Sequence, residues 1–287
     1  MSSLIKSDNE RPNRWGWLLL PCTLWLVGVF VLPVLSLVAQ SLFTYRGVGV
    51  VDNTLTIANY ARFVSDTFYW RLLGRTLLLG LTVLLCSVVL AYPVSYFLAR
   101  TTTRWRGLLI FLVITPMLIS LVIRNLGWMI LLGHQGFVNW VLTTTGIVTE
   151  PVGLLHNFAG IVIGLTHALL PFMILTLTNV LQRIDYQYEE AAMNLGANRW
   201  LTFRRIVLPL SWPGLLAGSL LVFTLAISAF TSPAMLGGNT ILFMATFIAQ
   251  QIRFVLNYPF GSTVSVILLV VTAALTYLAV RRSKELP

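Results

Sequence analysis

The stretch Glu189–Leu210, EEAAMNLGANRWLTFRRIVLPL, decides how this sequence is interpreted. It is the most charged run between two long apolar segments. Acidic residues at its start and arginines towards its end match the polarity of helix dipoles. Gly196 stands where a left-handed residue would end a first short helix, and Pro209 would end a second one over about residues 198–207. The stretch therefore predicts two short helices joined by a tight turn, which we call the elbow.

The composition around the elbow is that of a membrane protein. Of 287 residues, 57% are hydrophobic and only 10% are charged, against roughly 25% in an ordinary soluble domain. The net charge of +10 does not favour a nucleic-acid partner, because the basic residues cluster at the ends of apolar runs, where lipid and topology explain them. We therefore expect the chain to be surrounded by membrane lipid.

Six apolar stretches are long enough to cross a bilayer, since a spanning helix needs about 20 mostly apolar residues. Each is a continuous run without the period-two alternation of a membrane barrel, so all six are predicted to be helices. The predicted fold class is all-α, with six transmembrane helices. The stretches are Trp17–Leu42, Leu77–Leu98, Leu108–Leu132, Phe158–Leu181, Pro213–Leu236 and Phe260–Val280.

Lysine and arginine predict the orientation. With the N-terminus inside, 13 basic residues fall on inner segments and five on outer segments, so both termini are predicted to be cytoplasmic. The inner set is Lys6, Arg11, Arg14, Arg100, Arg104, Arg106, Arg183, Arg199, Arg204, Arg205, Arg281, Arg282 and Lys284. The expected organisation is a cytoplasmic tail (1–16), a first helix with a long outer loop (17–75), a five-helix core (76–281) that contains the elbow region (about 185–212), and a second tail (282–287).

The outer loop, Phe43–Arg75, contains turn-forming residues and a mixed stretch that could form a short interfacial helix. Its aromatic residues suit a membrane–water boundary, where amphipathic rings settle; docking of a partner is the alternative. These residues are Tyr60, Phe63, Phe68, Tyr69 and Trp70.

Several chemistries are not indicated. The sequence has no phosphate-binding loop, no His-Glu-x-x-His and no Gly-x-Ser-x-Gly, so we expect no catalytic residues in this chain. Cys22 and Cys86 lie inside apolar segments and predict neither a disulfide framework nor a metal site. None of the nine Asp and Glu residues lies in a predicted span, whereas ion-coupled carriers rely on embedded carboxylates. We therefore expect the energy for any transport to come from another polypeptide.

The elbow also carries a family signature. Glu190-Ala191-Ala192, then three residues, Gly196, nine residues and Ile206-x-Leu208-Pro209 resemble the EAA motif of permease subunits of binding-protein-dependent ABC importers. Shorter motifs at Asn59–Phe63, Leu121–Trp128 and Ser232–Gly238 resemble the spermidine/putrescine class of these permeases. Two other interpretations of the elbow remain, an amphipathic helix on lipid headgroups and an ordinary basic loop. Neither of them requires a glycine in the middle.

The resemblance implies a type I ABC importer permease fold in a bacterial inner membrane, with the elbow as a coupling helix. It implies separate ATPase subunits that bind ATP and magnesium, a second and related permease subunit, and a periplasmic substrate-binding protein. No cofactor is expected in this chain. The implied ATPase-coupling residues are Glu190, Ala191, Ala192, Gly196, Ile206, Leu208 and Pro209.

Polar residues inside the predicted spans are candidates for lining the solute pathway, because hydroxyl groups offer adaptable hydrogen bonds. An arginine within a span is costly unless it faces protein, water or the interface; the alternative for Arg124 is that it snorkels outwards or caps a helix C-terminus. The candidates are Ser120, Arg124, Asn125, Trp128, Ser228, Thr231 and Ser232.

The expected cargo is a small polar organic solute. The resemblance favours a polyamine such as spermidine or putrescine, although the fifth span lacks the acid that a polycation pathway would be expected to offer. Amino acids, opines and other organic ions are the alternatives. A secondary carrier and a purely structural membrane scaffold are the hypotheses from other classes.

Overall fold

The computed structural model describes residues 16–238 and 241–283. Of the predicted tail 1–16 the structure describes Gly16, and of the predicted tail 282–287 it describes residues 282 and 283. The basic residues Lys6, Arg11, Arg14 and Lys284 therefore lie outside the described part. The helices are α1 (Gly16–Ser41), α2 (Ala58–Ser65), α3 (Thr67–Arg100), α4 (Arg106–Leu118), α5 (Leu121–Leu132), α6 (Phe137–Thr144), α7 (Phe158–Leu181), α8 (Gln187–Asn194), α9 (Arg199–Thr202), the π-helix η1 (Phe203–Val207), α10 (Leu208–Leu210), α11 (Trp212–Ser228), α12 (Thr231–Leu236), α13 (Met244–Arg253) and α14 (Tyr258–Ser283).

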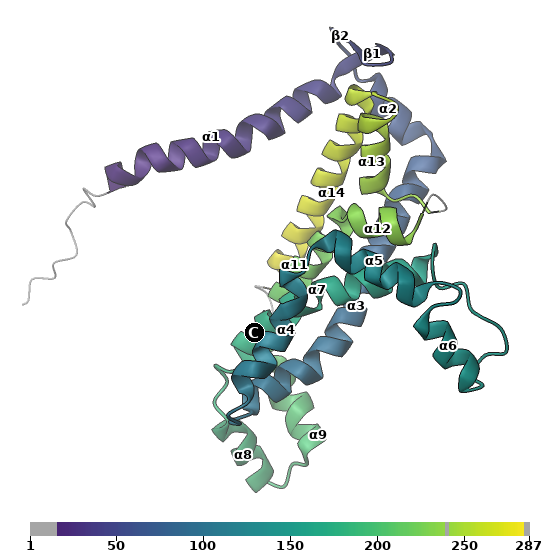
Figure 1. Cartoon of the computed structure of the whole chain (residues 1–287). Helices are drawn as coiled ribbons and strands as arrows, with labels where there is room; N and C mark the ends of the chain where they lie inside the picture. Colours follow the sequence, from purple (N-terminus) through teal and green to yellow (C-terminus); the bar gives the residue numbers. More distant parts are fainter. Residues whose placement is uncertain (1–15, 239–240, 284–287) are drawn as a thin grey trace, which may run out of the picture.

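Helix α3 runs through most of the molecule, from the end with the outer loop to the end with the elbow (Figure 1). It begins after Asp66, whose Oδ1 accepts a hydrogen bond of 2.8 Å from the backbone N–H of Phe68. This cap starts the helix ten residues before the predicted span at Leu77, because the aromatic run between them continues as helix. The N-terminal half of α3 packs against α13 and α14, and its C-terminal half against α7 and α11.

The central core lies where α3, α7 and α11 cross. Its buried side chains include Val83 of α3, Met173 of α7 and Val222 of α11, each fully buried. Gly80 of α3 lies against Ile227 and Phe223 of α11, where a side chain would meet the Ile227 methyl group. Small residues at crossings let membrane helices approach closely. The elbow is attached to this three-helix core.

A second core is aromatic and lies near the start of α3. Phe63 and Tyr69 are buried against Phe260, with 5.2 Å between the ring centroids of Tyr69 and Phe260. The prediction of an interfacial aromatic belt is therefore wrong for Phe63 and Tyr69, because α13 and α14 supply an apolar surface that sequence periodicity did not reveal. Phe68 and Trp70 are exposed, as a boundary position requires.

A two-stranded hairpin departs from the all-α expectation. Strands β1 (Phe43–Gly47) and β2 (Val50–Leu55) pair antiparallel, and Gly49 takes a φ of +72° in the turn. Arg46 and Asp52 form an ion pair of 2.6 Å across the strands. A glycine-containing turn next to a β-branched run favours this local pairing.

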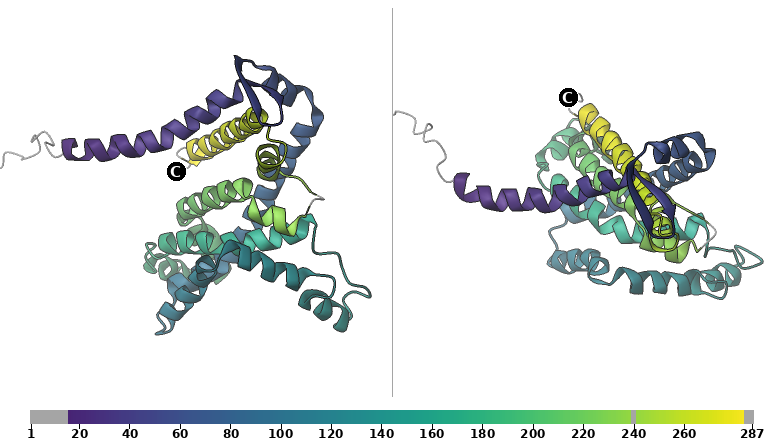
Figure 2. Two further views of the ribbon diagram at one scale, coloured as in Figure 1. Left: turned by 45° about the horizontal axis from the view of Figure 1, so that its top comes forward. Right: turned by 90° about the horizontal axis from the view of Figure 1, so that it is seen from above.

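Helix α1 contacts α14 and projects from the body of the molecule (Figures 1 and 2). Its C-terminal end is held by hydrogen bonds: the Ser41 carbonyl accepts bonds of 3.1 Å from Asn59 Nδ2 and from Thr263 Oγ1. Trp25 and Phe30 are among its exposed apolar side chains. Such a surface needs lipid or another protein to cover it.

Four helices in the described part are long and apolar enough to cross a membrane: Leu20–Ser41, Thr67–Arg100, Phe158–Leu181 and Tyr258–Arg282. Two bent helix pairs, Arg106–Leu118 with Leu121–Thr144 and Arg199–Leu210 with Trp212–Ser228, would raise the number to six if each pair is one span. The first, second, fourth and sixth predicted stretches thus fall on the four long helices, whereas the third and the fifth are not single straight helices.

The third predicted span, Leu108–Leu132, breaks after Leu118, with a bend of 95° between its two parts. Ser120 takes an extended ψ of 135° there. Pro116 weakens the last turn of α4 because it has no N–H to donate, and Arg124 of α5 donates a hydrogen bond of 2.8 Å to the Pro116 carbonyl. A side chain thereby replaces a backbone donor at the break.

The fifth predicted span, Pro213–Leu236, also breaks. Helix α11 ends at Ser228, and Ala229 is extended before α12 begins. Pro233 explains the position of this break. In a continuous helix the Pro233 ring would clash with the carbonyl of Ala229, whereas proline is tolerated in the first turn of a new helix. The two breaks create the irregular backbone around the cavity described below.

Candidate functional site

The turn of the elbow is a helix C-cap built on glycine. Helix α8 ends with Gly196 at a φ of +88°, as the sequence predicted. The N–H of Gly196 bonds to the Met193 carbonyl and that of Ala197 to the Ala192 carbonyl, both at 3.0 Å, which is the Schellman pattern. Two residues later, Asn198 Oδ1 accepts a hydrogen bond of 2.8 Å from the Leu201 N–H and starts α9.

The second limb of the elbow differs from the prediction at Pro209. The helix does not stop there: it continues as α9, η1 and α10 to Leu210, and bends by 65° before α11. In η1 the N–H of Leu208 bonds to the carbonyl of Phe203, five residues back. This wider π-turn leaves room for the Pro209 ring. The limb therefore leads directly into α11.

The elbow has an inner and an outer face. On the inner face, Val207 is fully buried against Tyr92 of α3 and Leu177 of α7. On the outer face, Leu195 is 90% exposed and Trp200 is 69% exposed. Of the seven signature residues, Glu190, Ala191, Gly196 and Pro209 are exposed, and Ala192, Ile206 and Leu208 are half-buried.

Glu189 anchors the elbow to α3. Its side chain is 5% exposed, and its Oε1 lies 2.6 Å from an Arg100 guanidinium nitrogen. The Tyr96 hydroxyl donates a hydrogen bond of 2.6 Å to Glu189 Oε2, and Arg100 donates one of 2.9 Å to the Ile184 carbonyl. The charges are therefore paired where water is largely excluded.

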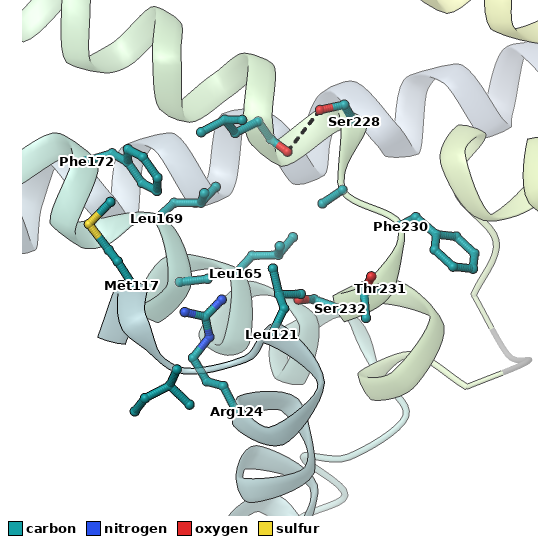
Figure 3. A pocket seen from close by; sticks show the side chains of 14 residues that line it. Met117, Leu121, Arg124, Leu165, Leu169, Phe172, Ser228, Phe230, Thr231 and Ser232 are labelled. Atoms are coloured by element: carbon teal, nitrogen blue, oxygen red, sulfur yellow. Dashed lines mark hydrogen bonds between the residues drawn. The ribbon is translucent and has the colours of Figure 1, made fainter. Parts of the chain in front are cut away.

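A cavity of about 500 Å³ lies between the two helix breaks. Figure 3 shows Arg124 directed into it, with Leu169 and Phe172 of α7 nearby and Thr231 and Ser232 on α12. Four of the seven predicted pathway residues line the cavity, and the structure brings them together from three separate helices. They are Arg124, Ser228, Thr231 and Ser232.

The other three predicted pathway residues do not line this cavity. Asn125 is fully buried and its Oδ1 accepts a hydrogen bond of 3.2 Å from Ser232. Trp128 Nε1 donates one of 3.2 Å to His167 Nδ1 on α7. Asn125 and Trp128 thus hold α5 against α12 and α7, behind the cavity wall, and Ser120 lies at the break itself.

Arg124 combines two roles that the sequence presented as alternatives. It caps the end of α4 through the Pro116 carbonyl, and its guanidinium also borders the cavity. The lining residues of this cavity include no Asp or Glu. The described lining of the cavity therefore provides a positive charge and hydroxyl groups but no carboxylate.

Residues 91–284 match the family described as "Binding-protein-dependent transport system inner membrane component". The chain belongs to this family. The permease is thus a multi-pass protein of a bacterial inner membrane and a transport component, not itself an enzyme. Two related sequences are the spermidine/putrescine transport system permease proteins PotB of Haemophilus influenzae (33% identical, covering 91% of each chain) and of Escherichia coli K12 (34% identical, covering 91% of this chain and 95% of the relative).

Solved structures of ABC importers share the fold of the permease. A bacterial alginate ABC transporter in complex with an alginate pentasaccharide-bound periplasmic protein aligns with a TM-score of 0.76 at 18% identity, covering 93% of each chain. The inward-facing MetNI methionine ABC transporter aligns with a TM-score of 0.58 at 21% identity, covering 77% of the permease and 99% of that chain. These likenesses establish the type I importer permease fold.

Sequence reasoning missed the anchoring role of Glu189 in the permease. It assigned Glu189 to the helix dipole, Arg100 to the basic bias of inner loops, and gave Tyr96 no role. A signal was present, because adjacent residues on a helix point about 100° apart. With Glu190 facing outwards, its neighbour Glu189 faces a different direction, and in the structure this is the side where Arg100 lies.

Proposed function

We propose that this permease forms half of the translocation pathway of an ATP-driven importer and that its elbow docks on a separate ATPase subunit. The observation that carries the proposal is the elbow itself, which presents the exposed Glu190, Ala191 and Leu195 away from the body of the molecule. Small residues beside a tight turn permit close approach of a partner, and an exposed carboxylate can pair with a basic residue on it.

The proposed topology has six spans, with both termini and the elbow in the cytoplasm. The elbow and the hairpin lie at opposite ends of the molecule (Figure 1). Arg104 before α4, Arg183 after α7 and Arg204 in η1 belong to the inner set and to the segments at the elbow end, which supports the orientation through the positive-inside rule. ATP and magnesium would bind to the partner ATPases, and this chain would need no cofactor.

The proposed assembly has a second, related permease subunit, two ATPases and a periplasmic binding protein. The family description and the binding-protein complex among the structural relatives support it. Closure of the two ATPases would pull on two elbows, and the attached helices would rock between inward-open and outward-open states. The exposed α1 offers a surface that the second permease or lipid would cover.

Purification of the complete importer tests the docking. We expect an ATPase subunit to co-purify with the wild-type chain and expect Glu190→Arg to reduce its recovery roughly tenfold, because the change replaces a charge-assisted contact by repulsion. Mass spectrometry and ATPase assays of the eluate measure this. Glu150→Arg is the matched control, since Glu150 is also exposed but lies in the segment between α6 and α7 and not in the elbow. An active importer without any ATPase would contradict the proposal.

The cargo that we favour is a polyamine of the spermidine or putrescine type. The similarity to the two PotB proteins over 91% of the chain supports it. The hydroxyl groups of Ser228, Thr231 and Ser232 can accept hydrogen bonds from ammonium groups. The binding protein and the second permease would supply any carboxylate that the pathway requires.

A second candidate is an organic solute with a carboxylate, such as an amino acid or an opine. Arg124 favours it, because its guanidinium borders a cavity whose lining residues include no Asp or Glu. A guanidinium recognises a carboxylate well and repels a polycation.

Arg124→Gln separates the two candidates. For a polyamine cargo we expect uptake of labelled putrescine or spermidine to stay unchanged or to rise, because a repulsive charge is removed while glutamine keeps a donor for the Pro116 carbonyl. Competition by unlabelled polyamines and by amino acids gives the specificity. A fall in uptake of tenfold or more, with competition by carboxylate solutes, would replace the polyamine by the second candidate.

A further inference from the structure

Three side chains form a cluster between the end of α3 and the first limb of the elbow, in which Glu189 is buried and Tyr96 and Arg100 are half-buried. We call Tyr96, Arg100 and Glu189 the latch. Tyr96 and Arg100 lie one turn apart on α3, and each contacts a different oxygen of Glu189, both at 2.6 Å. Arg100 also lies over the ring of Tyr186, at 5.6 Å from its centroid. The latch thus fastens α8 to α3 through both oxygens of one carboxylate.

The second limb of the elbow is fastened to the same part of α3 by different contacts. Phe203 of η1 packs edge-on against Tyr92 and Tyr96, with centroid distances of 5.2 and 6.4 Å. The Tyr92 hydroxyl lies 2.7 Å from Ser211 Oγ, at the bend before α11. One face of α3 therefore holds both limbs.

We propose that the latch transmits the movement of the elbow to α3, so that Glu189, Arg100 and Tyr96 are positioning residues for coupling ATP hydrolysis to transport. The inference rests on the proposed docking of the elbow to an ATPase, and it assigns the two neighbouring glutamates opposite tasks. Glu190, which is exposed, contacts the ATPase. Glu189, which is buried, contacts the pathway-forming part of the same chain.

The physical reason is the cost of separating buried charges. If the elbow moved without α3, Arg100 and Glu189 would each lose their partner in surroundings with little water, and an uncompensated buried charge is strongly unfavourable. The elbow and α3 therefore move together. Because α3 packs against α7 and α11, which border the cavity, the movement reaches the cavity walls.

A merely structural anchor would give a different result from a coupling device. An anchor only keeps the elbow folded for docking, so its loss lowers ATPase recovery, hydrolysis and uptake together. A coupling device allows docking and hydrolysis without it but lowers the amount of solute moved for each ATP. The ratio of uptake to hydrolysis is therefore the measurement that separates the two roles.

The test uses the complete importer in proteoliposomes, with Glu189→Gln and the milder Tyr96→Phe. We expect ATPase recovery and hydrolysis to stay within about twofold of wild type, and the ratio of uptake to ATP hydrolysed to fall about tenfold in Glu189→Gln, the factor expected for loss of a charge-assisted contact. Tyr96→Phe removes one hydroxyl group and should give a smaller fall in the same ratio. Arg104→Met is the matched control, since it removes a basic residue next to the end of α3 whose guanidinium lies over Trp105, not over the elbow.

Each outcome decides the proposal. A normal ratio in both variants, or a loss of ATPase recovery parallel to the loss of uptake, would overturn the coupling role of the latch. Failure of the wild-type chain to recover any ATPase would instead overturn the proposed docking. If Glu189→Gln did not fold, Tyr96→Phe would decide alone, because it preserves the ion pair of 2.6 Å between Arg100 and Glu189.

Discussion

Replacement of Gly196 by valine is expected to abolish transport while the chain still inserts into the membrane. Gly196 has a φ of +88°, and the described residues leave open space around it, with no atom within 4 Å of the position that a Cβ would take. Within this chain the substitution therefore costs only backbone strain, about 1–2 kcal/mol for an L-residue in this conformation. A side chain at this turn would instead project into the surface that we assign to the ATPase.

The expected loss of uptake for Gly196→Val is roughly thirtyfold or more, which corresponds to about 2 kcal/mol at a central contact of an interface. Uptake in cells and the amount of chain in purified membranes are the two measurements. Gly146→Val is the matched control: Gly146 has a φ of +74°, also has open space around it and lies in the segment between α6 and α7. It carries the same strain without the proposed partner.

Comparable losses of uptake in the two glycine variants would show that strain alone is responsible. Normal uptake and normal ATPase recovery in Gly196→Val would contradict the docking of the elbow. Comparison of two glycines with positive φ in one chain thus separates the loss of partner binding from the effect of backbone strain.

The elbow was predictable because its determinants are local. A left-handed glycine after an amphipathic turn specifies a C-cap, and an asparagine two residues later specifies the next helix start. Gly196 and Asn198 take these roles in the structure. The apolar runs were equally visible, since length and composition suffice to place a helix in a membrane.

The cavity and the latch were less predictable because they depend on contacts between distant segments. Arg124 and Ser232 border the same cavity because the third and fifth apolar runs both break, and a proline shows that a break is favoured without showing which direction the chain then takes. Likewise, Arg100 and Glu189 are separated in the sequence by the third and fourth predicted spans, which form α4, α5 and α7. No local pattern pairs them, although a buried charge predicts that some partner exists.

The second large effect that we expect is a loss of stability at the crossing of α7 and α11 beside the elbow. A Cβ on Gly214 would lie 2.7 Å from Val180 Cβ and 2.8 Å from its Cγ2. Val180 is β-branched and has little rotamer freedom in a helix, so it cannot turn away. Gly214→Val should therefore push the helices apart, and overpacking of this kind costs about 1–3 kcal/mol.

Thermal unfolding of the purified chain in detergent measures this cost, and we expect Gly214→Val to unfold at a clearly lower temperature than wild type.

Gly74→Val provides the control, because Gly74 is also helical but has no atom of the described chain within 4 Å of a Cβ. Valine has a higher helix propensity than glycine, so Gly74→Val should be neutral or slightly stabilising. Val180→Ala should restore part of the stability of Gly214→Val, since it removes the Cγ1 and Cγ2 atoms that would clash. Equal unfolding temperatures for Gly214→Val and Gly74→Val would mean that α7 and α11 do not cross as closely as the structure places them.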